Sequence, residues 1–256
     1  DRIHWETGPN RGACAARNKG LALARADYVM FLDADDYITG PFLASGIEAL
    51  TQQQADLGIG PHKISSEDSI KNFQPPFVKN DLEISQHFCE VVTPPCGVLW
   101  KRLFVLEVGG WLEDLKRDQD LELMFRAFSK RPRVCTWRDG FGVYFQHDSE
   151  GRITNTIDPE ILDARCNVYQ RCAAFLVIQG HTFGFSYNFA RRKVYELWRR
   201  AARENPRSPE YFRAKENFKK AGFSGHAGTL QHRLVATIIG IRAKERMTVA
   251  LAKSCS

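Results

Sequence analysis

A short apolar run that ends in three aspartates constrains this chain more than any other feature. Residues 28–32 show no polar alternation, which is typical of a strand covered on both faces in a parallel sheet. Asp33, Asp35 and Asp36 follow at its carboxyl end, the edge at which open α/β sheets bind ligands. Carboxylates this close repel one another unless a cation lies among them. The pattern therefore predicts an α/β domain with a ligand site at this edge.

The three acids suit a hard divalent cation. Mg²⁺ or Mn²⁺ takes one or two protein carboxylates and completes its shell with water and phosphate oxygens. The alternative is that residues 33–36 form a solvated turn in which an acid caps the next helix. Because Asp-x-Asp also recurs by chance, the three acids alone leave both interpretations open.

The residues before the strand extend the pattern. Gly12, Ala16, Arg17, Asn18 and Gly20 open a short helix, and the segment Phe-Leu-Asp-Ala-Asp-Asp follows it. In this order they resemble the first half of family 2 glycosyltransferases of the GT-A type. The resemblance implies a GT-A (Rossmann-like) α/β fold with a mostly parallel sheet.

The same resemblance implies roles for the first acids and for an arginine. Asp35 would bind the metal, and Asp33 would bracket the ribose or a metal-bound water. Arg17 is expected near the start of a helix over residues 12–26, where amide dipoles favour phosphate, and would face the nucleotide. The alternative is a surface arginine that pairs with Asp27 or Asp33.

A second acidic group precedes an amphipathic helix. Apolar residues at helical spacing over 121–128 place Asp118 at the helix entry, where an acid ordinarily caps the helix. The Gly-Gly-Trp segment at 109–111 and the acids after it resemble the family's Gly-Gly-Phe and Glu-Asp motifs. That resemblance implies that Asp118 is the general base of an inverting transfer. Arg117 stands where the family has Glu, so Asp120 remains an alternative base.

The chemistry explains why such a base is needed. An acceptor hydroxyl has a pKa far above 7 and must lose its proton as it attacks the anomeric carbon, and a positioned carboxylate contributes ~10²- to 10⁴-fold in rate. The resemblance further implies that His147 is a metal ligand and that Arg152 lies near the diphosphate. For His147 the alternative is an ordinary surface histidine.

Charge divides the chain unevenly. Residues 1–190 hold 20 Lys/Arg and 25 Asp/Glu, whereas residues 191–256 hold 16 and 5. From residue 159 onward the pattern predicts four helices, over residues 159–178, 185–203, 208–221 and 229–252. These basic helices suit an anionic membrane surface, or they form a solvated or buried face. No nucleic acid partner is expected.

We expect a glycosyltransferase domain over residues 1–155 and a helical, basic C-terminal region over residues 156–256. The family begins with a strand, a helix and a second strand that carry the nucleotide-base site, so we expect the sheet to be N-terminally incomplete. Seven scattered cysteines without a Cys-x-x-Cys pair predict free thiols in a reducing compartment, and no signal peptide opens the chain. The expected location is the cytoplasm, at the inner face of the membrane if the basic helices bind it.

These features predict a metal-dependent inverting glycosyltransferase that uses Mn²⁺ or Mg²⁺. The expected donor is a UDP- or GDP-linked sugar, and the expected acceptor is a carbohydrate or lipid-linked hydroxyl. One alternative is a catalytically incomplete module that binds a partner or a membrane surface. A nucleotidyltransferase is a second alternative, but it would need a glycine-rich phosphate loop near the amino terminus, and the sequence has none there.

Overall fold

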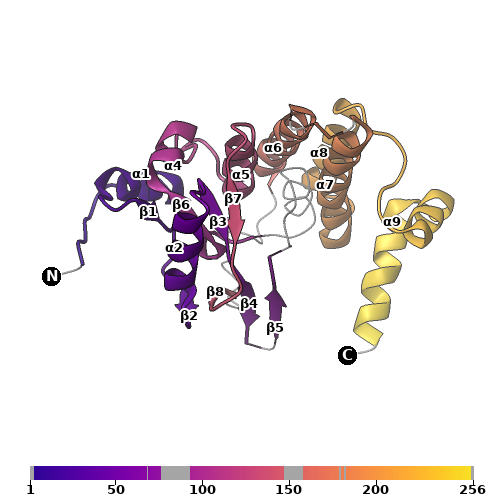
Figure 1. Cartoon of the computed structure of the whole chain (residues 1–256). Helices are drawn as coiled ribbons and strands as arrows, with labels where there is room; N and C mark the ends of the chain where they lie inside the picture. The colour runs from indigo at the N-terminus through magenta and orange to yellow at the C-terminus, as the bar shows by residue number, and fades with distance from the viewer. Residues whose placement is uncertain are drawn as a thin grey trace. The chain divides into compact units, whose positions relative to one another are not determined.

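The computed structural model describes residues 3–67, 69–75, 93–146, 158–178, 180–181 and 183–254 (Figure 1). The chain divides into two compact units. The first comprises Asp1–Lys79 and Val92–Gln146, and the second comprises Asn80–Val91 and His147–Ser256. The expected domain boundary near residue 155 lies outside the described residues and stays a prediction.

The first unit is an α/β domain whose described strands form two four-stranded sheets. Its helices are α1 (Ala13–Leu23), α2 (Phe42–Gln52), the 3-10 turn η1 (Pro95–Gly97), α4 (Arg102–Val108) and α5 (Gln119–Phe128). Its strands are β1 (Tyr28–Val29), β2 (Tyr37–Thr39), β3 (Leu57–Ile59), β4 (His62–Ser66), β5 (Ile70–Phe73), β6 (Val98–Lys101), β7 (Val134–Thr136) and β8 (Phe141–Gln146). The strand orders are β1-β6-β3-β7 and β2-β8-β4-β5.

Strand directions differ from the expected mostly parallel sheet, although the α/β class is confirmed. The pairs β3–β7 and β4–β8 are parallel, whereas β1–β6, β3–β6, β2–β8 and β4–β5 are antiparallel. Strands β3 and β4 follow each other closely in the chain but belong to different sheets. Pro61 lies between them, and because proline has no N–H to donate, it interrupts a central strand.

The strand before the first acids is shorter than expected. Only Tyr28 and Val29 pair with β6, opposite Lys101 and Trp100. The chain then runs without strand hydrogen bonds, with Phe31 buried and Leu32 47% exposed. The expectation that this run is covered on both faces is therefore wrong at its carboxyl end.

The core that supports β3, β6 and β7 is built around one tryptophan. Trp137 packs edge-on against Phe42 of α2, with ring centroids 5.0 Å apart. Leu50, Leu99 and Cys135 complete this buried cluster. Figure 1 shows α2 beside these strands, and the burial of one face of α2 fixes the sheet that carries the β1 end.

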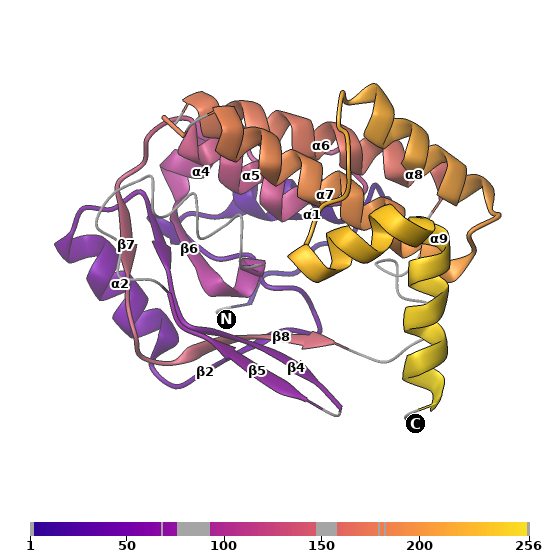
Figure 2. The same cartoon turned by 90° about the vertical axis from the view of Figure 1, so that its right-hand side faces the viewer.

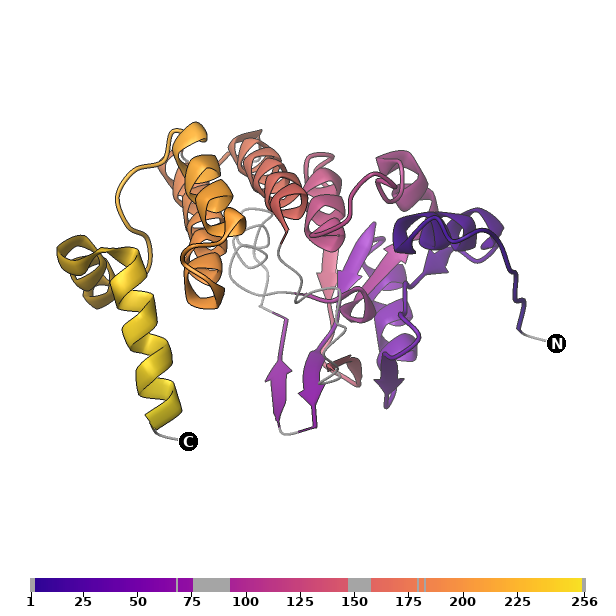
Figure 3. The ribbon, with the colours of Figure 1, turned by 180° about the vertical axis from the view of Figure 1, so that it is seen from behind.

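The second unit is helical, as predicted, over the residues that the structure describes. It contains α6 (Pro159–Ile178), α7 (Phe183–Glu204), α8 (Pro209–Lys220) and α9 (Leu230–Ser254). Helices α6, α7 and α8 pack side by side (Figure 3). Arg213 of α8 donates to Asp163 of α6, with Nε 2.8 Å from Oδ1, and this ion pair joins the two helices.

Helix α9 is broken, which the sequence pattern did not predict. Gly240 has φ 79° and ψ 154°, so the backbone leaves the helical conformation there and divides α9 into two arms (Figure 2). Only glycine adopts a positive φ of this kind without strain. Within the described part of the chain, no helix is both long and apolar enough to cross a membrane.

Candidate active site

Arg17 and Asp33 form the centre of the site. Arg17 Nη2 lies 2.7 Å from Asp33 Oδ1 and 3.0 Å from Oδ2, and Arg17 Nη1 donates to Gln119 Oε1 at 3.2 Å. The Arg17 side chain is only 13% exposed. The pairing with Asp33 is the one that the alternative interpretation expected, but Arg17 is not a surface residue, and its role in facing the nucleotide stays a prediction. Arg17 lies in the second turn of α1, which begins at Ala13, and thus near the start of the helix as expected.

A tryptophan holds this arginine in place. The Arg17 guanidinium carbon lies 4.4 Å from the centroid of the Trp111 ring, and Phe31 packs edge-on against the same ring. Asn18 makes two 2.8 Å hydrogen bonds with the backbone N–H and C=O of Trp111. Gly110 is required beside it, because an added Cβ would lie 2.6 Å from Asn18 Oδ1 and its φ is +64°.

A buried ion pair supports the loop that carries the tryptophan. Glu122 is fully buried, and Arg126 Nη2 lies 2.8 Å from its Oε2. Arg126 also donates to the carbonyls of Val108 and Gly110. This pair therefore ties α5 to the end of α4. Sequence reasoning missed it, although a Glu–Arg pair at i,i+4 beside the apolar face was the available signal.

Asp118 precedes α5 in a left-handed conformation, with φ 52° and ψ 31°. Its side chain makes no capping hydrogen bond to α5, so the helix-cap alternative is not what the structure shows. A non-glycine residue in this region is strained, and such strain concentrates at functional sites. Asp118 therefore lies at the entry of α5, as predicted, without capping the helix through its side chain, and its role as the base stays a prediction.

Asp120 lies in the same electrostatic neighbourhood. Burial raises the pKa of Asp120 to about 6; Arg17 lowers it, and the nearby Asp33 and Asp118 raise it further. Its Oδ1 atom is buried and has no hydrogen-bond partner among the described residues. Asp120 of α5 therefore lies within electrostatic range of Asp118, of Asp33 and of the Arg17 guanidinium.

Asp36 is a further acid in this electrostatic neighbourhood. Burial raises the pKa of Asp36 to about 6, against a hydrogen bond from the Phe145 N–H to Oδ1 at 3.1 Å, and Asp33 and Asp35 raise it further. Phe145 lies in β8, two residues before His147 in the sequence. We use the name acidic site for Arg17, Asp33, Asp36, Asp118 and Asp120.

The other predicted metal ligands are placed less completely. Asp35 is exposed in a turn that the Asp36 N–H closes by donating to the Asp33 carbonyl at 3.0 Å. His147 and Arg152 lie outside the described residues and stay predictions. Within the described ranges, no three His, Cys, Asp or Glu side chains gather as a metal site. A magnesium ion, however, needs only one or two protein carboxylates.

An open pocket adjoins the site. It has a volume of about 480 Å³, and its lining includes Arg17 and Asp33 together with residues of α1 and of the segment after β1. Arg17 and Asp33 therefore face an open space large enough for a ligand, and the guanidinium of Arg17 is a group that suits a phosphate.

The fold and this site define the class as a GT-A-type glycosyltransferase fold. The chain superposes on S. aureus TarS 1–349 with a TM-score of 0.55 at 15% identity, covering 83% of this chain and 61% of that one. It superposes on TarS 1–349 in complex with UDP-GlcNAc with a TM-score of 0.54 at 16% identity, covering 82% and 62%.

Sequence comparisons show similarity to one family over the N-terminal part of the chain. Residues 1–97 match the model of glycosyl transferase family 2. Over 149 residues the chain is 28% identical to the uncharacterized glycosyltransferase EpsJ of Bacillus subtilis (strain 168), covering 53% of this chain and 42% of that protein. These residues are therefore similar to glycosyltransferase family 2, in agreement with the resemblance read from the sequence; the family model matches less than half of the chain. It spans less than two thirds of the length of these relatives.

Proposed function

We propose that this chain moves a sugar from a nucleotide-diphosphate donor to an acceptor hydroxyl, with inversion at the anomeric carbon. The observation that carries the proposal is the electrostatic proximity of Asp120 to Asp118, Asp33 and Arg17, together with the contact between Arg17 and Asp33. The similarity of residues 1–97 to glycosyl transferase family 2 and the UDP-GlcNAc of the TarS complex support a UDP- or GDP-linked donor. The acceptor belongs to a polysaccharide, a lipid carrier or a protein glycan.

Asp118 is the proposed base. As the acceptor oxygen bonds to the anomeric carbon, its proton passes to the Asp118 carboxylate and the bond from that carbon to the diphosphate oxygen breaks. Asp120 is the alternative, but its Oδ1 atom is buried. We therefore assign the proton transfer to Asp118. Asp120 would place a further negative charge next to this base.

The acids also fit a divalent cation. Burial is the main reason that the pKa of Asp36 and of Asp120 is raised, and neighbouring acids, among them Asp33 and Asp35 beside Asp36 and Asp33 and Asp118 beside Asp120, add to it, so a cation among these acids would be favoured. Asp35 and His147 would hold Mn²⁺ or Mg²⁺, with Asp33 beside them, and Arg152 would lie near the diphosphate. Such an ion neutralises the charge that develops on the leaving diphosphate.

Calorimetry tests the donor and metal site. We expect UDP or GDP to bind in the presence of Mn²⁺, and Asp35→Ala to weaken this binding at least about tenfold because a carboxylate ligand is lost. Asp139→Ala removes an exposed acid from the β7–β8 turn and serves as the matched control. Unchanged Mn²⁺ affinity in Asp35→Ala would contradict the metal site. An absence of nucleotide binding in the parent chain would favour the binding-module alternative.

A further inference from the structure

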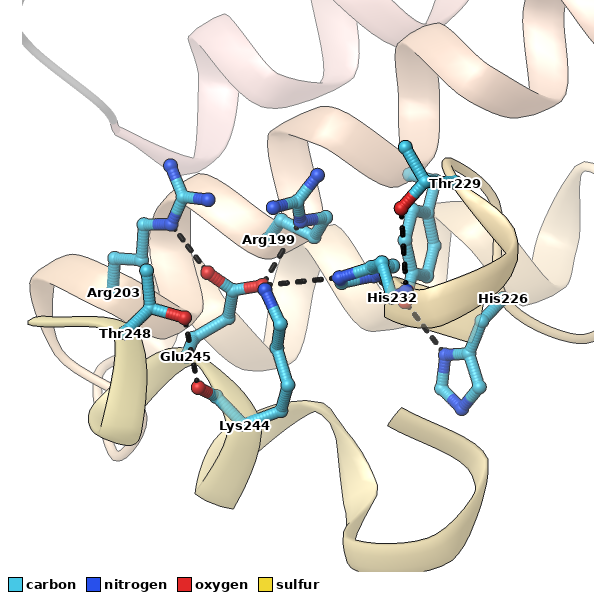
Figure 4. Close-up of polar contacts among 9 residues, drawn as sticks. Arg199, Arg203, His226, Thr229, His232, Lys244, Glu245 and Thr248 are labelled. Carbon is cyan, nitrogen blue, oxygen red and sulfur yellow. Dashed lines mark hydrogen bonds and ion pairs between the residues drawn. The ribbon is translucent and has the colours of Figure 1, made fainter. Parts of the chain in front are cut away.

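The second arm of α9 is anchored to α7 by a buried ion cluster (Figure 4). Glu245 is fully buried, and Arg199 Nε and Lys244 Nζ lie 2.9 Å and 3.2 Å from its Oε1. Arg203 donates to Oε2, and His232 Nδ1 lies 3.8 Å from Oε1. We call these five residues the Glu245 cluster. Through these contacts, the side of α9 that carries Glu245 faces α7.

The first arm of α9 is anchored by neutral contacts to the same helix. The Tyr195 hydroxyl of α7 lies 3.1 Å from His232 Nε2 and 2.6 Å from His226 Nδ1. Ala236, one turn beyond His232, is 1% exposed. Because His232 and Ala236 face α7, the opposite side of this arm must face outward.

That outward side is apolar. Leu230, Leu234 and Ile238 follow one another at four-residue spacing and are 68%, 55% and 80% exposed. Large aliphatic side chains in such a row are normally buried in a soluble domain. Their exposure is set by the inward anchors and does not result from a loosely placed helix.

The charges that α9 shows to solvent are basic. Its sequence contains one acid, Glu245, which is buried and already paired. Arg233, Arg242 and Arg246 are exposed. The wider segment 191–256 holds 16 Lys/Arg against 5 Asp/Glu. An apolar row beside exposed arginines therefore lies in a region of strong positive charge.

We propose that the outward face of the first arm of α9, formed by Leu230, Leu234 and Ile238 with the neighbouring Arg233, binds the surface of an anionic lipid bilayer, with Arg242 and Arg246 of the second arm adding positive charge. The aliphatic row enters the boundary between headgroups and acyl chains, and the arginines remain at the level of the lipid phosphates. A single row on one helix is enough for this contact, whereas a specific protein interface needs a larger complementary patch. The inference is independent of sugar transfer.

Vesicle flotation of the whole chain tests this surface. We expect the chain to float with phosphatidylcholine vesicles that contain phosphatidylglycerol, to remain behind with phosphatidylcholine alone, and to bind less at high salt. The double variant Leu234→Glu and Ile238→Glu should reduce partitioning at least about tenfold, because two inserting side chains become anionic.

Matched variants distinguish a specific effect at this face of α9 from a general effect of added negative charge or of unfolding. Leu103→Glu and Leu106→Glu make the same change at exposed positions of α4 and should float like the parent chain. Leu234→Ser and Ile238→Ser, which add no charge, should also weaken binding, and circular dichroism checks that each variant is folded. The proposal is overturned if the parent chain binds no anionic vesicle or if the α4 control loses binding equally. Self-association of the parent chain that the α9 variants abolish, without vesicle binding, would assign the face to a second copy.

Discussion

Buried carboxylates in the two units have different partners, and their pKa values are shifted in opposite directions. In the helical unit, three cations donate to Glu245, and although burial alone would raise its pKa, the hydrogen bonds from Arg203 and Arg199 lower it. In the acidic site, Arg17 pairs with Asp33, and burial together with the neighbouring acids raises the pKa of Asp120 to about 6 although Arg17 lowers it. Glu245 is thus held ionised by its partners and serves the fold. Asp120 is held partly protonated near neutral pH, and a raised pKa of this kind is typical of sites that bind metals or move protons.

Loss of the proposed base should have the largest effect. Asp118→Asn removes the proton acceptor but keeps a residue that tolerates the left-handed backbone, so we expect transfer to fall ~10²- to 10⁴-fold with nucleotide binding retained. Release of nucleotide from the sugar donor that the chain uses measures this. Asp114→Asn, an exposed acid in the preceding loop, is the control. Transfer at nearly the parental rate would remove Asp118 from the mechanism.

The compensated acid should matter for stability. Glu245→Gln leaves Arg199 and Lys244 without their carboxylate in a buried setting, and we expect the free energy of unfolding to fall by about 3 kcal/mol. Urea titration measures the change. Glu216→Gln breaks an exposed pair with Lys220 and should leave the unfolding curve nearly unchanged. Equal effects of the two variants would show that burial of Glu245 adds nothing.

The scaffold of the acidic site should be intolerant of small changes. Gly110→Ala places a Cβ 2.6 Å from Asn18 Oδ1 and imposes strain at positive φ, so we expect a loss of about 2 kcal/mol in the free energy of unfolding. Thermal denaturation checks it. Gly20→Ala in α1 meets no atom within 4 Å and should be neutral or stabilising. A neutral Gly110→Ala would mean that the Asn18–Trp111 contact is adaptable.

Acidification should change the stability of the two units in opposite directions. Folded Asp120 keeps its proton up to about pH 6, whereas the unfolded chain releases it near 3.8, so lowering the pH from 7 to 5 should stabilise the sheet unit by roughly 1 kcal/mol. Burial lowers the pKa of His232 to about 4, whereas the unfolded chain binds that proton near 6.5, so the helical unit should lose stability over the same range.

Hydrogen exchange resolves the units and tests both signs, with a chelator present to exclude metal. Asp120→Asn should reduce the pH dependence in the sheet unit, where Asp36 with its pKa of about 6 still acts in the same direction, and leave that of the helical unit unchanged. The prediction fails if exchange protection in both units changes in the same direction between pH 7 and 5.

Local patterns account for the part of the fold that the sequence predicted. Helix α6 has the predicted bounds, and α5 begins just after Asp118, because apolar spacing over one helix is a local property. The strand directions are not local. Pro61 and the position of β6 between β1 and β3 decide them, and only the assembled sheets show this.

The acids of the candidate site could be singled out from the sequence, whereas the residues that hold them in place could not. The family motifs located Asp33 and Asp118, whereas the stacking of Arg17 on Trp111 joins residues far apart in the sequence. The buried Arg126–Glu122 pair was hidden because charged residues on a helix usually face solvent. Contacts of this kind depend on the packing of α1, α4 and α5 together.

Tyr195, Arg199 and Arg203 recur every fourth residue of α7, so they form one row. Tyr195 meets the arm of α9 before Gly240, and the two arginines meet the arm after it. A single inserted residue between 195 and 203 would rotate part of this row by about 100° and release one arm while the other stayed engaged. The spacing of these three residues along α7 therefore determines where both arms of α9 are held, so the number of residues between 195 and 203 is constrained as well as their identity.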